Sequence, residues 1–214
     1  MRWILRKYPL FVLAVCLAAT GTAVVRGALG WSDAWQRVAV VLAGLHLLWL
    51  VLETWTTVRS STSTETATDR GTIYVYATAR AATVATACLV PADQRTYHPW
   101  MLAVPVVFAA AVALRLVAIR TLGRFYSHRV RALDDHEIVR TGPYRWVRHP
   151  AYLGMALAHV AFVVFFLNTA SAAALMVLLP TLVVRILVEE RMLLRLPGYS
   201  AYAASHRRVI PWVW

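Results

Sequence analysis

The sequence predicts an all-α, polytopic membrane protein, built as a transmembrane helical bundle of about six spans, or of five. Hydrophobic residues make up 60% of the 214 residues, and only 15% of the residues are charged. Soluble domains carry roughly 25% charged residues, so this composition indicates a protein that lies in a lipid bilayer. The mean hydropathy of +0.58 agrees with that assignment.

Four apolar runs in the first half of the chain are each long enough to cross the hydrocarbon core, which needs about 20 mostly apolar residues in a helix. These runs cover residues 8–26, 35–58, 72–90 and 99–119. The polar stretch between the second and third runs, residues 59–71, is typical of a loop. Basic residues ahead of the first run could mimic a secretory signal, but we expect a first span that is retained.

The last two apolar runs predict a helical hairpin with both ends on one side of the membrane. They cover residues 151–167 and 171–188, and a tight polar turn at residues 168–171 joins them. We therefore divide the chain into residues 1–119, with about four N-terminal spans, and residues 120–214, with the hairpin and a polar C-terminal tail.

The distribution of basic residues predicts which face of the bundle lies in the cytoplasm. Six spans place both termini on one side, where 16 of the 22 lysines and arginines fall, against 3 on the other side. The positive-inside rule therefore places both termini and the loop at residues 120–148 in the cytoplasm. The net charge of +12 does not indicate a nucleic-acid partner, because the arginines are dispersed between apolar runs. The preference for arginine over lysine, with much alanine and valine, indicates a GC-rich bacterial genome, so we expect a bacterial plasma membrane.

The two cysteines show no spacing that would predict a metal site. Cys16 and Cys88 lie inside separate apolar runs. We expect both thiols to pack as small apolar side chains, and we predict no metal ligands in the chain.

Two charged residues inside the predicted spans have structural explanations. A charge at the centre of a membrane helix costs about 2.5–3.5 kcal/mol. Arg115 lies near the cytoplasmic end of its span, so we expect its side chain to reach the interface by snorkelling. Arg80 lies deeper, and Glu53 on the preceding helix could form an ion pair with it.

A third charged residue inside a predicted span, Arg185 in the stretch RILVEER, indicates a functional site more directly. Arg185 precedes Glu189 by four residues, so the two side chains share one helix face. An ordinary intrahelical ion pair at the lipid boundary would also explain this spacing. However, the second carboxylate at Glu190 makes the helix end unusually acidic, and adjacent carboxylates suit an amino or sulfonium group.

The stretch RTGPYRWVRHPAYLG, directly ahead of the hairpin, combines positive charge with turn-forming residues. Gly142 and Pro143 predict a tight turn, and Pro150 predicts the first turn of the next helix. The N-terminus of that helix offers free N–H groups and a positive dipole end, which suit a carboxylate or hydroxyl. His149 and Tyr152 add donors with flat faces. Arginines and aromatic residues are also common at membrane interfaces, so residue types alone leave both explanations open.

The order and spacing of these motifs resemble the isoprenylcysteine carboxyl methyltransferase family of integral membrane enzymes. GPYRWVRHPAYLG, the hairpin, and then EERMLLRLPGYSAYAASHRRVIP follow one another as in the family. The resemblance covers residues 120–214, whereas the first four spans are similar only in being apolar. It implies a methyltransferase that uses S-adenosyl-L-methionine and releases S-adenosyl-L-homocysteine, with its cofactor pocket at the cytoplasmic side of the last spans.

The resemblance also implies roles for particular residues. Arg185 would be the catalytic residue that holds the methyl-accepting carboxylate, and Glu189 would hold the amino-acid end of the cofactor. The rest of the cofactor site would be lined by His136, Glu137, Ile138, Val139, Tyr144, His149, Pro150, Ala151 and Tyr152.

Methyl transfer to a carboxylate gives the charges at the end of the last span a physical reason. A carboxylate has a reference pKa near ~4, so it is ionised at neutral pH and needs no general base. Catalysis would come from alignment of the reacting atoms and removal of water from the nucleophile. Arg185 would stabilise the anionic acceptor through a forked hydrogen bond. We expect a lipophilic small-molecule or prenylated acceptor that reaches the site from membrane lipids; in a bacterium, a small isoprenoid or lipid acid could be that acceptor.

Three other functions agree with parts of the sequence. A phospholipid or other lipid N-methyltransferase has a similar C-terminal pattern, but its amine acceptor must lose a proton, which a nearby arginine disfavours. An NADPH-dependent sterol-type membrane reductase would carry Asn and Glu where this chain has Ala151 and Met155. A non-enzymatic scaffold with a decayed motif would have no reason to retain costly charge inside the membrane.

Overall fold

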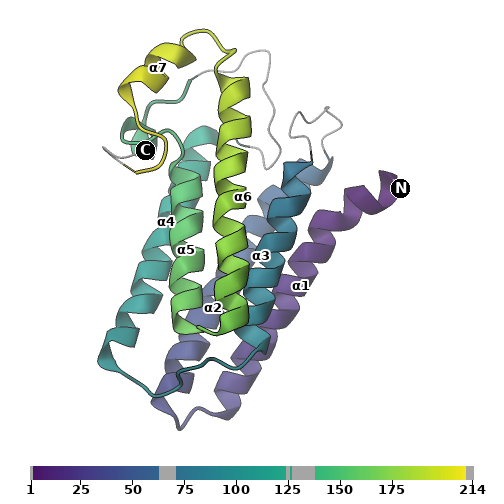
Figure 1. Cartoon of the computed structure of the whole chain (residues 1–214), viewed down its shortest axis with the longest axis vertical. Helices are drawn as coiled ribbons and strands as arrows, with labels where there is room; N and C mark the ends of the chain where they lie inside the picture. The colour runs from purple at the N-terminus through teal and green to yellow at the C-terminus, as the bar shows by residue number, and fades with distance from the viewer. Residues whose placement is uncertain (1, 63–70, 124–125, 127–137, 211–214) are drawn as a thin grey trace.

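The computed structural model of the chain describes residues 2–62, 71–123, 126 and 138–210. Long helices run side by side as one bundle, and a short helix lies over one end (Figure 1). No strand is present in the described part of the chain, so the all-α prediction is confirmed. In chain order the elements are α1 (Arg2–Leu29), α2 (Ala34–Thr62), α3 (Thr72–Leu89), η1 (Pro99–Leu102), α4 (Ala103–Leu122), η3 (Gly142–Arg145), α5 (Pro150–Phe165), α6 (Thr169–Leu193) and α7 (Tyr199–Ser205).

Each of the six predicted apolar runs corresponds to one long helix. Four segments are long and apolar enough to cross a membrane, namely Leu10–Leu29, Ala34–Thr54, Pro99–Leu122 and Thr169–Leu193. The two other helices are shorter, with 18 residues in α3 and 16 in α5. At 1.5 Å per residue, a helix the length of α5 reaches only about 24 Å, less than the ~30 Å hydrocarbon core. The helical membrane bundle is confirmed, and six remains an approximate number of spans.

The predicted helical hairpin is present, with a tighter turn than the sequence indicated. Asn168 caps α6, because its side chain accepts a hydrogen bond from the Ser171 N–H at 2.9 Å and its own N–H donates to the Ser171 hydroxyl at 3.0 Å. This capping box begins α6 at Thr169, two residues before the predicted start. The Asn168 amide also donates to the Thr86 carbonyl at 3.2 Å, which ties the hairpin to α3.

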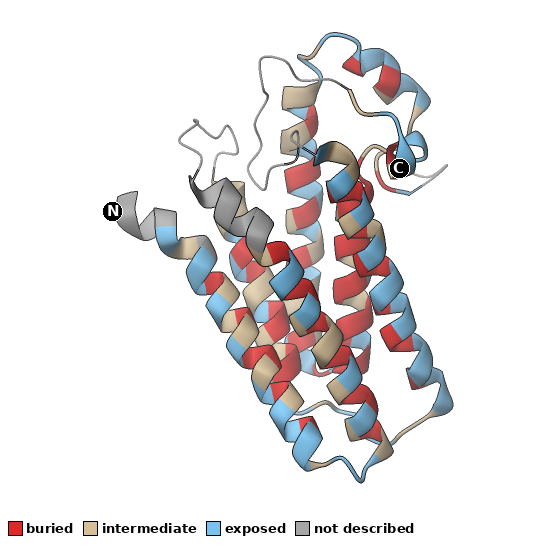
Figure 2. Ribbon diagram, turned by 180° about the vertical axis from the view of Figure 1, so that it is seen from behind, coloured by how far each residue is buried: buried red, intermediate tan, exposed pale blue. Residues whose placement is uncertain are grey.

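The interior of the bundle is apolar and aromatic, and its outer surface is apolar as well. Figure 2 shows buried residues along the inward sides of the helices and exposed ones along the outward sides. Trp49, Phe108 and Phe162 are almost fully buried, whereas Val106 and Met176 are 68% and 71% exposed. Such exposed apolar side chains are expected where a helix faces lipid. Both cysteines are buried free thiols, in agreement with their predicted packing role.

One carboxylate inside the bundle binds arginines from two neighbouring helices. Glu53 on α2 is 3% exposed; it accepts a hydrogen bond from Arg115 Nε on α4 and lies 3.6 Å from Arg80 Nη1 on α3. Arg115 also donates to the Ala151 carbonyl and to the Tyr126 hydroxyl, each at 3.2 Å. The predicted Arg80–Glu53 pair is confirmed. The expectation that Arg115 snorkels is wrong: its side chain is buried, because these acceptors satisfy it inside the protein.

Gly154 allows α4 and α5 to approach each other closely. A Cβ atom at this position would lie 2.5 Å from the Ala111 carbonyl oxygen and 2.9 Å from the Arg115 nitrogen. Both contacts are with the backbone of α4, so a side chain here would force the two helices apart. The glycine therefore fixes the distance between α4 and the N-terminal part of α5.

We expect Gly154→Ala to lower the free energy of unfolding by about 1–3 kcal/mol, the usual cost of overpacking a closely packed contact. Thermal unfolding of the purified protein in detergent would measure this change. Gly44→Ala is the matched control, since a Cβ at Gly44 meets nothing within 4 Å. Equal unfolding temperatures for the two variants would contradict the role given to Gly154.

We expect Arg115→Met to destabilise the protein by about 3 kcal/mol, because loss of one partner of a buried ion pair leaves the other charge poorly compensated. The control is Arg120→Met, which removes an exposed arginine from the last turn of the same helix. The same unfolding assay compares the two variants, and a control that unfolds as early as Arg115→Met would show that the pair contributes nothing.

Candidate active site

The predicted site residues lie at the end of the bundle that carries both chain termini (Figure 1). Two local features position them. Gly142 has a φ of 57°, a conformation that favours glycine, and it begins the tight turn η3. Pro150 occupies the first turn of α5 directly after the non-helical residue His149. The turn and the helix start therefore lie where the sequence predicts them.

Arg185 is buried in the interior of the bundle, between α3, α5 and α6. Its side chain is 4% exposed, and Nη1 donates to the Thr72 hydroxyl of α3 at 3.3 Å. The guanidinium carbon also lies 5.5 Å from the centre of the Tyr76 ring, a distance typical of a cation–π contact. Tyr152 and Glu189 are close enough to interact electrostatically with this arginine. The cation therefore faces the predicted cofactor residues and does not face lipid.

Glu189 and Tyr152 contact each other beside this arginine. The Tyr152 hydroxyl donates to Glu189 Oε2 at 2.8 Å. Within residues 2–62, 71–123, 126 and 138–210, no other hydrogen bond reaches this carboxylate. Burial raises the pKa of the Tyr144 phenol above its usual range, and the nearby Glu189 charge adds to this increase. Tyr144 therefore stays protonated at neutral pH. Separately, the Glu189 oxygen that Tyr152 does not bind is available to a cation among the described residues.

The neighbouring carboxylate, Glu190, has a different environment. It is 3% exposed and forms salt bridges with Arg148 and Arg208. His149 Nε2 lies 3.2 Å from its Oε1 atom. Successive residues of a helix point about 100° apart, which separates the surroundings of Glu190 from those of Glu189. Among the described residues, Glu189 therefore has fewer partners than Glu190 and retains an oxygen that can bind a further cation.

The C-terminal tail packs against the corner before α5. The Arg148 and His149 N–H groups donate to the Arg207 and Arg208 carbonyls, each at 2.8 Å. The Tyr202 hydroxyl of α7 donates to a backbone carbonyl of η3 at 2.6 Å. No local pattern in the sequence indicates these contacts, because they join groups about 60 residues apart in the chain. The tail thus fixes the position of the backbone that leads into α5.

Two further predicted cofactor residues, Ile138 and Val139, lie around the same corner. Ile138 lies next to the turn before α7, since a Cβ at Gly198 would be 3.5 Å from its side chain. Val139 packs against the small buried cluster of Ala118, Tyr144 and Ala151. His136 and Glu137 lie outside the described residues.

Two residues beside Arg185 were missed by the sequence analysis. Thr72 and Tyr76 belong to a helix that the sequence marked only as an apolar run rich in threonine. Their contact with Arg185 depends on how α3 packs against α6. No local pattern in the sequence reports that packing.

The comparisons with known proteins cover this part of the chain. Residues 101–195 match the sequence profile of the isoprenylcysteine carboxyl methyltransferase family. The protein-S-isoprenylcysteine O-methyltransferase of Saccharomyces cerevisiae is 37% identical over 83 residues, which are 37% of this chain and 35% of that protein. Protein-S-isoprenylcysteine O-methyltransferase B of Arabidopsis thaliana is 34% identical over 105 residues, 47% of this chain and 53% of that protein. A probable protein-S-isoprenylcysteine O-methyltransferase of Oryza sativa subsp. japonica is 32% identical over 105 residues, 47% of this chain and 55% of that protein.

The chain thus spans between 35% and 55% of the length of these relatives. The segment that matches the family profile contains α4, the His149–Pro150 corner and most of the hairpin, including Arg185 and Glu189. Helix α3, with Thr72 and Tyr76, and the C-terminal tail also contribute to the site but lie outside the matched segment. Residues 101–195 are therefore similar to the isoprenylcysteine carboxyl methyltransferase family, and the similarity covers less than half of the chain.

Proposed function

We propose that this chain is a membrane methyltransferase that uses S-adenosylmethionine to methylate the carboxylate of a lipophilic acceptor at the cytoplasmic face. The observation that carries the proposal is the burial of Arg185 beside Tyr152 and Glu189. A cation and a carboxylate one helical turn apart provide separate places for an anionic acceptor and a cationic cofactor. The names of the yeast and plant relatives support a prenylated acceptor.

The polar and aromatic side chains around Arg185 and Glu189 fit S-adenosylmethionine, which has an ammonium, a carboxylate, hydroxyls and an aromatic base. Glu189 would bind the ammonium with the oxygen that Tyr152 leaves available. The start of α5 has a positive dipole end, which suits the carboxylate or a hydroxyl, although Pro150 has no N–H and the Tyr152 and Leu153 N–H groups already donate to the His149 carbonyl. Tyr144 and His149 would provide flat faces for the base, with Ile138, Val139, Pro150 and Ala151 around them and His136 and Glu137 preceding them in the chain. When bound, this cofactor supplies an electrophilic methyl group on a sulfonium.

Arg185 would hold the acceptor as an anion. The carboxylate is the nucleophile in its ionised form, so the chain needs no residue to remove a proton from it. Two opposite charges about 4 Å apart attract by about 4 kcal/mol at an effective dielectric constant of 20, enough to keep the acceptor ionised in a partly dry site. Thr72 and Tyr76 fix the guanidinium from the side of α3, which limits the orientations of a carboxylate bound to it.

The opposite face of α6 would allow a lipid tail to remain in the bilayer. Val183, Val184 and Leu187 are 40%, 48% and 36% exposed, although Arg185 between them is buried. The helix thus presents an apolar surface to lipid and its charged groups to the interior. The positive-inside distribution of the arginines supports a cytoplasmic location for this end of the bundle and for the C-terminus.

The central test is methyl transfer by the purified protein from methyl-labelled S-adenosylmethionine to a farnesylated cysteine with a free carboxylate, or to a membrane lipid extract. We expect a product whose label is released as methanol by mild base, which identifies a methyl ester. Arg185→Ala should reduce the rate at least 100-fold, because the anionic acceptor loses its buried counter-charge. Arg191→Ala, an exposed arginine further along the same helix, is the matched control.

The chemical form of the product separates the alternatives. Label that survives base treatment would indicate an amine acceptor and a lipid N-methyltransferase. No incorporation from either acceptor source, with binding of S-adenosylmethionine also absent, would overturn the proposed methyltransferase.

The two adjacent glutamates should respond differently to neutralisation. We expect Glu189→Gln to weaken S-adenosylmethionine binding about tenfold or more, because a charge-assisted hydrogen bond to the ammonium is lost. Glu190→Gln should instead lower the unfolding temperature, since this carboxylate binds Arg148 and Arg208. Equilibrium binding of the labelled cofactor and thermal unfolding, measured on both variants, check the assignment. Equal cofactor affinities in the two variants would contradict the role of Glu189.

A further inference from the structure

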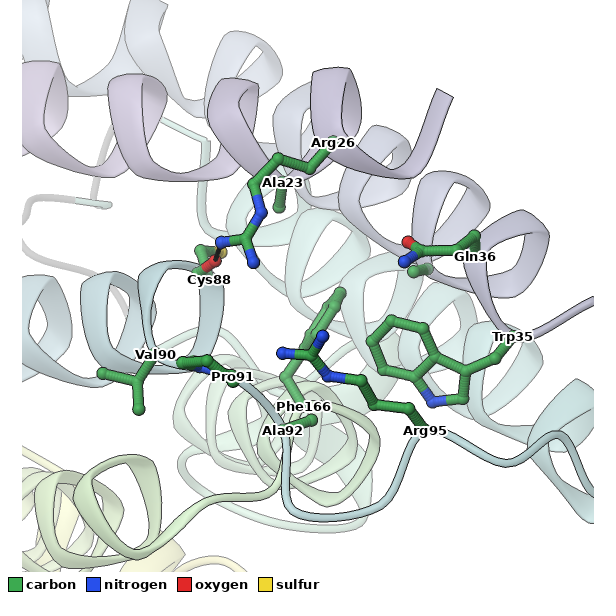
Figure 3. A pocket seen from close by; sticks show the side chains of 12 residues that line it. Ala23, Arg26, Trp35, Gln36, Cys88, Val90, Pro91, Ala92, Arg95 and Phe166 are labelled. Carbon is green, nitrogen blue, oxygen red and sulfur yellow. Dashed lines mark hydrogen bonds between the residues drawn. The ribbon is translucent and has the colours of Figure 1, made fainter. Parts of the chain in front are cut away.

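A second polar feature lies at the opposite end of the bundle from the candidate active site. A small hollow is formed there by the end of α1, the start of α2, the end of α3 and the segment that follows it (Figure 3). Its lining includes Arg26, Trp35, Gln36, Cys88 and Arg95. None of these residues takes part in the methyltransferase site, so the hollow needs a separate explanation.

Two arginines point into this hollow. In Figure 3 the guanidinium groups of Arg26 and Arg95 approach the same space from opposite sides. Arg26 Nη1 donates to the Cys88 carbonyl at 3.5 Å, a long hydrogen bond that leaves most of the guanidinium available. In the described part of the chain, neither arginine forms a salt bridge with a carboxylate. Among the described residues, no carboxylate therefore neutralises the positive charge of the hollow.

The two acidic residues near this end do not supply the missing counter-charge. Asp33 accepts a hydrogen bond from the Gln36 backbone N–H at 3.1 Å. Asp93 is exposed, and its backbone N–H donates to the Leu167 carbonyl at 2.8 Å. Both carboxylates lie more than 4 Å from the arginine nitrogens of the hollow.

A buried neutral donor adds to the two charged ones. Trp35 lines the hollow and is 6% exposed, yet its indole N–H has no hydrogen-bond partner among the described residues. A buried donor without an acceptor is destabilising. Stacking on Phe165, with the ring centres 5.1 Å apart, fixes the indole in place. Trp35 thus borders a hollow whose two guanidinium groups favour an occupant with acceptors and negative charge.

The surroundings favour an occupant that is anchored in the membrane. Leu29, Leu89 and Val90 are 85%, 49% and 40% exposed at this end, so the hollow adjoins apolar surface. Trp31 is 52% exposed nearby, and tryptophan is enriched at the level of lipid headgroups. Arginine binds phosphate through paired N–H donors. We propose that the hollow binds a phosphate-type anion, namely the headgroup phosphate of an anionic phospholipid, on the face opposite the methyltransferase site.

The test measures binding of three probes to the purified full-length protein in detergent: short-chain phosphatidylglycerol, short-chain phosphatidylcholine and inorganic phosphate. Native mass spectrometry or a thermal-shift titration gives the affinity of each probe. We expect phosphatidylglycerol to bind more tightly than phosphatidylcholine. Arg26→Gln and Arg95→Gln should each weaken its binding about tenfold, which corresponds to about 1.4 kcal/mol.

Arg37→Gln is the matched control, because it removes an exposed arginine from the same end that does not line the hollow. Trp35→Phe removes only the indole N–H while keeping a ring to stack on Phe165, and it should weaken binding by a smaller factor. If inorganic phosphate binds more tightly than phosphatidylglycerol, and the same variants lose this binding, the site binds a soluble anion. That result would overturn the lipid source. Affinities that fall equally in Arg37→Gln and in the two hollow variants would overturn the site itself.

Discussion

The compensation of charge inside an apolar bundle is the constraint on which this structure depends. Glu53 is held between Arg80 and Arg115, and Glu190 is held by basic residues from the corner before α5 and from the C-terminal tail. An isolated charge at these depths would be costly, whereas a paired one fixes the helices that carry it. The same constraint distinguishes Glu189, which has one tyrosine as a partner and lies beside the buried Arg185. Glu189 and Arg185 are the two groups to which we assign binding of the reactants.

The buried ion pair of Glu53 and Arg115 also helps to position the candidate site. Arg115 joins Glu53 on α2 to the Ala151 carbonyl at the start of α5, and Gly154 sets the approach of α4 to the same helix. From the other side, the tail after α7 binds the backbone of Arg148 and His149. The short stretch that precedes and begins α5 is therefore held by elements from both halves of the sequence. Positioning of this kind is what a displacement reaction needs when no proton transfer assists it.

The sequence was sufficient to predict the helices, the hairpin and the turn at Gly142, because each depends on local hydropathy or on residues with restricted backbone conformations. It also predicted the pairing of Arg80 with Glu53 and placed Arg185 on the same helix face as Glu189. It failed for Arg115, since snorkelling and burial are equally compatible with an arginine near the end of a span until its neighbours are known. Thr72 and Tyr76 could not be found for a related reason: their contact with Arg185 arises from packing between helices that are distant in the sequence.

The contact of α3 with Arg185 has a consequence for how proteins of this kind diverge. The groups that we propose to bind the cofactor lie on η3, α5 and α6, whereas Thr72 and Tyr76 approach the arginine from a helix outside the segment that matches the family profile. Substitutions along α3 could therefore alter which acids are accommodated while the methyl donor is handled unchanged. Selectivity for the acceptor would then change through substitutions in the N-terminal spans. The residues of the hairpin that act in methyl transfer would stay the same.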